Sequence, residues 1–292
     1  MLHLLKSVLT PHGSLSGEIL FCGRPLQEAD LREQSSKIGY VMQNPDSQIV
    51  TDKVWHELSF GLESLGYDNA TIRLRVAEMA SYFGIHQWFY KNVSELSGGQ
   101  KQILNLAAIM AMHPSLLILD EPTSQLDPIA ASDFLETVKK INRDIGTTVL
   151  LTEHRLQDII PYADRVFVMD KGNVYLEGTP REIGVKLKEQ KHGMFLSMPI
   201  PMQIYGETDS QATCPLTVSE GRQWLSHYCN EKGIASDSQR KSESTEKVRY
   251  TKTDSSKKEL SIQAKDVWFR YEKDSPDVVR DLSLEVKKGE FY

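Results

Sequence analysis

Two short, uninterrupted apolar segments constrain the fold of this chain most strongly. They are SLLILD at residues 115–120 and TTVLLTEH at residues 147–154. Strands that are apolar along their whole length are typical of a parallel sheet that is covered on both faces. Capped helical segments flank them, at residues 98–112 and from Asp127-Pro128 to about Gly146. Strands that alternate with helices predict an α/β domain with a parallel core sheet.

Further elements of the same domain follow from local patterns. Helical spacing is present in MLHLLKSVL at residues 1–9 and in TIRLRVAEMASYF at residues 71–83. Short β-rich segments, GEILFCG at 17–23 and KIGYVMQ at 37–43, end in turns. RVFVMDKGNVYLEG at 165–178 predicts a β-hairpin around its Lys-Gly-Asn turn. These patterns assign residues 1–182 to one body.

The remainder of the chain has a different composition. Residues 183–259 include a long Ser- and Lys-rich stretch without apolar periodicity, which predicts a polar linker, with a short amphipathic segment near 216–229. Residues 260–292 return to strand alternation. We expect these strands to fold back onto the first body and to pair near residues 17–22, because a tether raises their effective concentration.

Composition excludes some functional classes. The net charge of -6 argues against nucleic-acid binding by bulk electrostatics. No apolar run approaches the roughly 18 residues that a membrane-spanning helix needs. The three cysteines have no C-x-x-C spacing, which is typical of a reducing compartment and argues against a structural zinc site.

An anion site is predicted at the start of the helix at residues 98–112. Ser97 and Gln100 form a capping box, and Gly98 and Gly99 leave the first backbone N–H groups uncovered. Bare N–H groups and the helix dipole together favour a phosphate. The alternative is an ordinary capped helix.

Polar side chains follow three of the predicted strands. Asp120 and Glu121 end the strand at 115–120, His154 ends the next, and Gln43 follows KIGYVM. Ligands bind at this carboxyl edge of a parallel sheet. Asp120 is suited to hold Mg²⁺ through water, Glu121 to polarise an attacking water, and Gln43 to contact both metal and water. His154 could bond a γ-phosphate, although a single histidine at such a place is more often structural.

In order and spacing these residues resemble the motifs of the ATP-binding-cassette (ABC) transporter ATPases, over residues 1 to about 182. The resemblance assigns the Q-loop, signature, Walker B, D-loop and switch histidine to Gln43, Leu96–Gln100, Asp120 with Glu121, Asp127, and His154. It implies an α/β, P-loop NTPase-like ABC cassette with a parallel core sheet, a helical signature subdomain and an antiparallel β-subdomain. It also implies ATP and Mg²⁺ as cofactors. The D-loop departs mildly from the family, which usually has alanine where this chain has Gln125.

The family's phosphate-binding Walker A loop, G-x-x-x-x-G-K-[ST], does not occur in the 292 residues. Residues 1–9 resemble the helix after that loop, and residues 278–292 the strand before it in a following cassette. The chain therefore looks like the stretch between the two Walker A loops of a tandem ATPase: a first cassette body, a linker, and the opening strands of a second cassette. In that arrangement Gln43, Asp120, Glu121 and His154 serve the first cassette's ATP. The signature and Tyr271, which matches the adenine-stacking aromatic residue, serve the second's.

The segment around the Q-loop resembles the tandem ATPase of energy-coupling-factor importers, which take up vitamins or metal ions. The expected function is that of their ATP-hydrolysing component, seen as an incomplete chain. Expected partners are a membrane-embedded transporter subunit and a second ABC cassette, without nucleic acid, at the cytoplasmic face of the cell membrane. Two alternatives stay open: a catalytically silent binding module, and a non-transport ABC ATPase. This chain alone is expected to hydrolyse ATP negligibly.

The resemblance also places a partner surface after the Q-loop. Residues 44–62 border the groove that receives a helix of the membrane subunit in the family. Trp55 and Phe60 are expected to be exposed there. Charged substitutions at Val54 or His56 are expected to weaken the association without unfolding the chain. The alternative for Trp55 is packing inside the helical subdomain.

Overall fold

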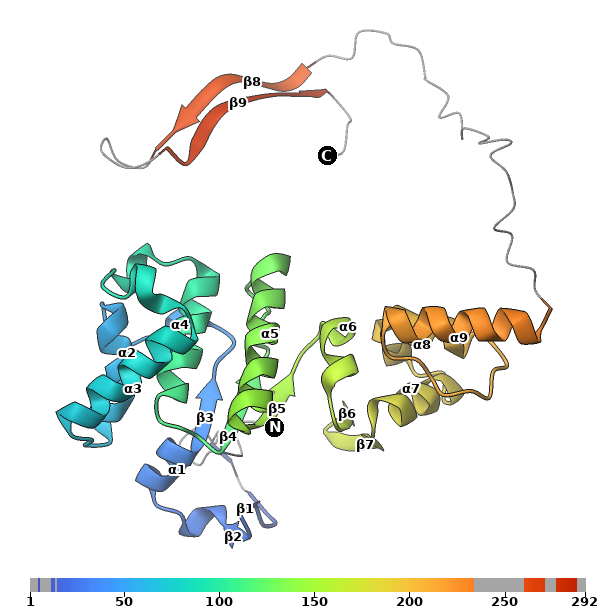
Figure 1. Cartoon of the computed structure of the whole chain (residues 1–292), viewed down its shortest axis with the longest axis horizontal. Helices are drawn as coiled ribbons and strands as arrows, with labels where there is room; N and C mark the ends of the chain where they lie inside the picture. Colours follow the sequence, from blue (N-terminus) through green and yellow to red (C-terminus); the bar gives the residue numbers. More distant parts are fainter. Residues whose placement is uncertain (1–4, 6–11, 14, 234–259, 271–276, 288–292) are drawn as a thin grey trace. The chain divides into compact units, whose positions relative to one another are not determined.

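The computed structural model describes residues 5, 12–13, 15–233, 260–270 and 277–287 (Figure 1). The helix expected at residues 1–9 falls almost wholly outside this range, as does Tyr271. The chain divides into two compact units, residues 1–234 and 235–292, and each is described here by itself.

The core of the first unit is a parallel three-stranded sheet. Its strands are β3 (Ile38–Val41), β4 (Leu116–Asp120) and β5 (Thr148–Thr152), with β4 in the centre. All pairings are parallel and continuous, from Ile38 opposite Leu116 to Asp120 opposite Thr152. The parallel core sheet predicted from the apolar segments is confirmed.

Two antiparallel hairpins accompany this sheet. β1 (Leu20–Phe21) pairs with β2 (Arg24–Pro25). β1 is shorter than the strand expected over residues 17–23. β6 (Val166–Asp170) pairs with β7 (Asn173–Gly178), so the hairpin predicted at 165–178 is confirmed. Its turn needs two left-handed residues, and Lys171 and Gly172 supply φ values of 47° and 82°.

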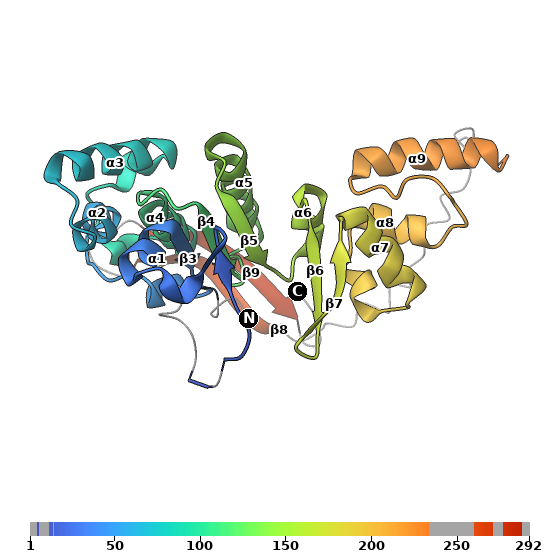
Figure 2. The same cartoon turned by 90° about the horizontal axis from the view of Figure 1, so that it is seen from below.

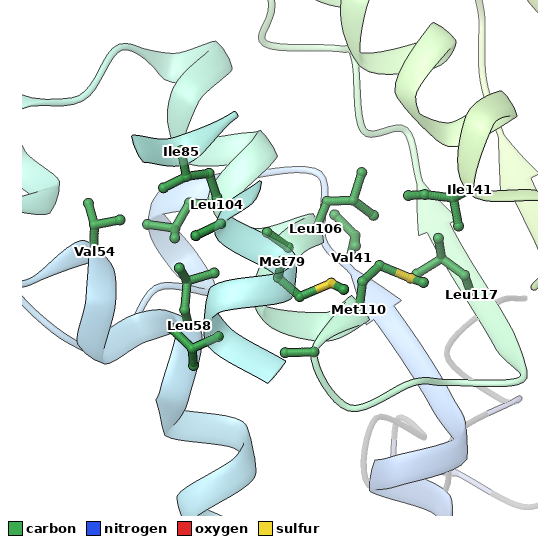
Figure 3. Packing of buried hydrophobic residues seen from close by; sticks show 14 of the residues in the cluster. Val41, Val54, Leu58, Met79, Ile85, Leu104, Leu106, Met110, Leu117 and Ile141 are labelled. Atoms are coloured by element: carbon green, nitrogen blue, oxygen red, sulfur yellow. The ribbon is translucent and has the colours of Figure 1, made fainter. Parts of the chain in front are cut away.

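Helices α2 (Val54–Ser64), α3 (Asn69–Tyr82) and α4 (Gly98–Met110) pack on one another beside the sheet, while α1 (Leu31–Lys37) leads into β3 (Figures 1 and 2). Their apolar faces form the main core, which Figure 3 shows from close by. Leu58 of α2 and Leu104 of α4 are fully buried in it, and Leu117 joins it from β4. Helix α5 (Pro128–Ile145) packs on α4 and begins and ends as predicted, with Asp127 as its N-cap and Gly146 left-handed at φ 78°.

A second core lies in the carboxyl-terminal part of the first unit. It involves α6 (Leu156–Ile159), α7 (Pro180–Glu189) and α8 (Ile200–Gly206), and α9 (Val218–Glu231) packs on α8. The apolar side chains come from β6, from α7 and α8, and from the segments beside them: Ile160, Val168, Ile183, Leu187, Phe195, Met198, Met202, Cys214 and Leu216.

The structure therefore differs from the polar linker expected from residue 183 onward. Residues 183–231 are mostly folded, because apolar residues spaced three to seven apart among polar ones give the helices one buried face. The overall composition of a segment does not reveal such a face, because it ignores the spacing of the apolar residues. Helix α9 occupies the segment for which an amphipathic element was expected, and Arg181 of α7 pairs with its Glu220 at 3.0 Å.

The second unit contains an antiparallel pair, β8 (Leu260–Phe269) and β9 (Val279–Lys287), with Ala264 opposite Leu284. Strands were expected over this range. The expected fold-back of these strands onto the first body stays a prediction.

The close approach of β3 to α4 gives a first testable prediction. A Cβ atom built on Gly39 would overlap Ile109 Cγ2 and lie 3.2 Å from Leu117 Cδ1. We expect Gly39→Ala to lower the free energy of unfolding by about 1–3 kcal/mol, the usual cost of overpacking. Urea unfolding of the chain measures it. Gly193→Ala, where a Cβ meets nothing within 4 Å, is the matched control, and equal stability of the two variants would contradict the prediction.

Candidate functional site

Asp120 ends the central strand β4, and two hydroxyl groups hold its carboxylate. Tyr40 Oη on β3 donates to Asp120 Oδ2 at 2.8 Å, and Thr152 Oγ1 on β5 donates to Oδ1 at 2.9 Å. Tyr40 is buried, and this burial is the larger cause that raises the pKa of its hydroxyl above the ordinary value of a tyrosine. The hydrogen bond to Asp120 raises the pKa further. The carboxylate is thus fixed in one orientation at the carboxyl edge of the sheet.

Glu121 lies beside it and contacts side chains from both neighbouring strand ends. Gln43 Nε2 donates to Glu121 Oε2 at 3.0 Å, and His154 Nε2 lies 3.0 Å from Oε1. The Glu121 side chain is 30% exposed and that of His154 is 81% exposed. The carboxylate is therefore bracketed by two polar groups and still open to water.

The backbone of Glu121 is left-handed, with φ 45°. This conformation is uncommon for a residue other than glycine and costs of order 1–3 kcal/mol. Three hydrogen bonds hold it there: Glu121 N donates to Thr152 O at 3.1 Å and to Thr152 Oγ1 at 3.2 Å, and Ser124 N donates to Glu121 O at 3.2 Å. In this conformation the Glu121 side chain meets Gln43 and His154 from the neighbouring strand ends.

Three more residues support this edge, and the sequence analysis did not identify them. They are Tyr40, Thr152 and Glu153. Glu153 accepts bonds from Thr123 N at 3.0 Å and from the Thr123 hydroxyl, and from His154 N at 3.0 Å. A hydroxyl inside an otherwise apolar strand was the available signal for Tyr40 and Thr152, and Glu153 carried none.

The N-terminus of α4 has the predicted capping box. Ser97 N donates to Gln100 Oε1 at 3.0 Å, and Gln100 N donates to Ser97 Oγ at 3.3 Å. Space beside Gly98 is open, because an added Cβ would meet nothing within 4 Å. At Gly99 the same atom would lie 3.1 Å from Ala130 Cβ, so glycine allows the start of α5 to approach. This geometry suits both an anion site and an ordinary capped helix.

Asp127 has a visible structural task. Its Oδ1 accepts from Ile129 N at 2.9 Å and from Ala130 N at 3.0 Å, which caps α5. Ala130, one of the two residues that Asp127 caps, is also the residue that approaches Gly99.

The structure thus brings Gln43, Asp120, Glu121 and His154 together at the carboxyl ends of β3, β4 and β5. A second group, Ser97, Gly98, Gly99 and Gln100, lies at the start of α4, with Asp127 at the adjoining start of α5. Tyr271 is outside the described residues, so its role stays a prediction.

The first group fits Mg²⁺ in the way nucleotide sites bind it. That ion is usually held by one or two protein carboxylates together with phosphate oxygens and water. Asp120 supplies a carboxylate, and Gln43 donates through Nε2, which leaves an amide oxygen as its acceptor. Among the described residues there is no cluster of three His, Cys, Asp or Glu side chains suited to a metal.

Comparison with known proteins connects this geometry to one family. Residues 1–124 match the family described as ABC transporter. A provisionally named ABC transporter ATP-binding protein of Bacillus thuringiensis is 37% identical over 292 residues, which cover 100% of this chain and 50% of that protein. A similarly named protein of Methanosarcina acetivorans is 32% identical, over 98% of this chain and 49% of that protein. The chain spans about half the length of these relatives.

Among solved structures, CbiO1 from Clostridium perfringens is similar in fold and sequence. Its structure is described as part of the ABC transporter complex CbiONQ. The TM-score is 0.55 and the identity 32%, over 65% of this chain and 76% of that one.

The Tyr40–Asp120 bond yields a second prediction, on pH dependence. We expect Tyr40→Phe to lower the free energy of unfolding at pH 7 by about 1.5–3 kcal/mol, because a charged acceptor loses its donor. The pKa of Tyr40 is raised on folding, so its contribution is complete below the unfolded value near 10 and is lost as pH rises above it. The difference between the two proteins should therefore narrow at alkaline pH.

Urea unfolding at pH 7 and at about pH 11 measures this. Tyr90→Phe is the control, because Tyr90 is 81% exposed. A stability difference for Tyr40→Phe that stays constant between the two pH values would contradict the prediction.

Proposed function

The chain belongs to the ABC transporter ATP-binding family, and we propose that Gln43, Asp120, Glu121 and His154 form the hydrolytic half of a nucleotide site in it. The observation that carries the proposal is the Glu121 carboxylate, held 3.0 Å from both Gln43 Nε2 and His154 Nε2 at the open edge of the sheet. A general base needs this combination of fixed orientation and access to water.

Each residue then has a distinct task. Glu121 accepts a proton from the water that attacks the γ-phosphorus of ATP, and Gln43 orients that water and the carboxylate. His154, whose side chain is 81% exposed, donates a hydrogen bond to the phosphoryl oxygen on which charge develops. Mg²⁺, when bound at Asp120 and Gln43, neutralises charge on the β- and γ-phosphates.

The start of α4 supplies the second part of the proposal. The N–H groups at the start of α4, at Gly98 and Gly99 beside Ser97 and Gln100, bind the γ-phosphate of a nucleotide held by another cassette. Asp127 lies at the junction of this site with α5. Residues 1–182 then form one cassette body, and residues 260–292 are the opening strands of a second, with Tyr271 stacking on its adenine.

The class of transported substrate is inferred from the resemblance of the segment around the Q-loop. We propose an importer of the energy-coupling-factor type, which takes up a vitamin or a metal ion, with this chain at the cytoplasmic face of the membrane. The likeness to CbiO1, described as part of a transporter complex, supports a transport role. Among the helices of the described residues, none is long and apolar enough to cross a membrane.

The proposed docking surface for the membrane subunit comprises Val50, Trp55 and Tyr90. These side chains are 67%, 43% and 81% exposed. They lie on neighbouring segments, because Val54 N donates to Lys91 O at 3.3 Å and Lys53 Nζ donates to Asn92 Oδ1 at 2.6 Å. The backbone at Val50 is held by a buried side chain, since Glu57 accepts from Val50 N and Thr51 N at 3.1 and 2.8 Å.

The structure corrects one expectation about this surface. Trp55 and Phe60 are exposed as predicted, but Val54 is fully buried. A charge at Val54 would lie inside the helical core and unfold it, so that substitution cannot report on partner binding.

A third prediction tests the role of Glu121. In a polypeptide where this chain follows a phosphate-binding loop, we expect Glu121→Gln to slow ATP hydrolysis by at least about 100-fold, the usual contribution of a general base. ATP binding should be unchanged, because the amide keeps the shape of the side chain. Phosphate release and nucleotide binding are the measurements, with Glu136→Gln on the exposed face of α5 as the matched control.

Undiminished hydrolysis by Glu121→Gln would contradict this role of Glu121. Turnover near the ~1 s⁻¹ usual for such chemistry by the 292-residue chain alone, which contains no Walker A sequence, would contradict the separate expectation that this chain alone hydrolyses ATP negligibly.

A fourth prediction tests the docking surface. We expect Trp55→Glu to weaken association with a membrane-embedded subunit by at least tenfold, since large aromatic side chains dominate interface energies. Co-purification from detergent extract measures it. Leu196→Glu is the control, because Leu196 is 75% exposed and lies next to Phe195 of the second core. Equal yields of the partner with both variants would count against this surface.

A further inference from the structure

We infer that Gln102 is a positioning residue, which sets the distance between Gln43 and Glu121 from inside α4. The inference rests on the proposed function for its catalytic meaning, although the geometry stands without it. Gln102 is fully buried. Its single amide nitrogen donates to two backbone carbonyls, Pro122 O at 3.1 Å and Met42 O at 3.3 Å.

These two carbonyls belong to the immediate neighbours of the site. Met42 precedes Gln43, and Pro122 follows Glu121. One buried side chain thus ties together the two backbone segments whose side chains meet at 3.0 Å. A displacement of Gln102 would change that distance from both ends.

Helix α4 holds the segment at 42–48 at two further points. Asn105 Nδ2 donates to Pro45 O at 3.1 Å, and Lys101 Nζ pairs with Asp46 Oδ1 at 2.7 Å. Within that segment, Gln48 accepts from Met42 N at 2.9 Å and donates to Tyr40 O at 3.0 Å. The loop after β3 is therefore fixed to α4 along its length.

Packing alone does not account for amides at these positions. Gln102 Oε1 and Asn105 Oδ1 are buried and have no hydrogen-bond partner among the described residues. Buried polar atoms that stay unpaired cost free energy, which a leucine or methionine would avoid. What the amides provide is their donors, directed at the loop carbonyls.

Gln102 also lies close to the predicted anion site. Helix α4 begins at Gly98, and Gln102 is in its second turn. A helix is stiff over this length, so a force on its N-terminus is transmitted to Gln102. An anion bound at residues 97–100 would in this way act on Gln43 and Glu121, and the positioning residue would couple the two sites.

The experiment compares Gln102→Met with Leu104→Met in the 292-residue chain without nucleotide. Methionine keeps the volume of either side chain, and only the first change removes the two donated bonds. Backbone hydrogen exchange is followed at Met42, Ser47, Gln48, Glu121 and Ser124, whose amides are bonded in the structure. The side-chain amide of Gln43 is followed by nitrogen-15 NMR.

For Gln102→Met we expect about tenfold faster exchange in both segments, 42–48 and 121–124, because two buried hydrogen bonds are lost. The Gln43 amide resonances should shift toward those of a free side chain. Leu104→Met should change neither. Asn105→Leu, a second variant, should speed exchange in 42–48 but not at 121–124.

Three outcomes would overturn the inference: unchanged exchange in Gln102→Met, a uniform increase across the chain, or a shift of the Gln43 amide that is equal in the Leu104→Met control. None depends on hydrolysis. Loss of the catalytic role of Glu121 would therefore leave these results intact, and the two ideas fail separately.

Discussion

The in-register pairing of Asp120 with Thr152, where β4 meets β5, is the contact on which the geometry of this edge depends. It places the Thr152 hydroxyl under the Asp120 carboxylate and the Thr152 carbonyl under Glu121 N. A slip of one residue would point each side chain to the opposite face of the sheet. Both acidic side chains keep their directions only while that register holds.

Register is in turn secured by burial. Leu117, Ile118 and Leu119 are fully buried, with Leu117 and Leu119 in the main core and Ile118 in the smaller cluster across the sheet. Apolar packing on both faces penalises any sliding of β4. The backbone at its end can then be strained, and the polar side chains there partly open to water, because apolar burial stabilises the strand independently of them.

Most of this architecture was predictable from the sequence. The continuous apolar strands, the Asp127-Pro128 start of α5 and its end near Gly146 are local signals, and each was found where expected. The grouping of Gln43, Asp120, Glu121 and His154 followed from one rule, that parallel strands end at the same edge. The supporting residues did not follow, since Tyr40, Glu153 and Gln102 act through partners between 20 and 80 positions away. An amphipathic segment was expected where α9 lies, whereas α7 and α8 were missed because the stretch after residue 183 was judged by its overall polar composition.

The left-handed backbone of Glu121 has a consequence for anyone who optimises this protein. Glycine or asparagine would adopt that conformation at lower cost, so selection for thermal stability alone would favour replacing the glutamate. The more stable descendants would lose the carboxylate to which Gln43 donates. If Glu121 has the role proposed above, selection for stability and selection for activity act in opposite directions at this position. A library screened solely by melting temperature would then discard the proposed base.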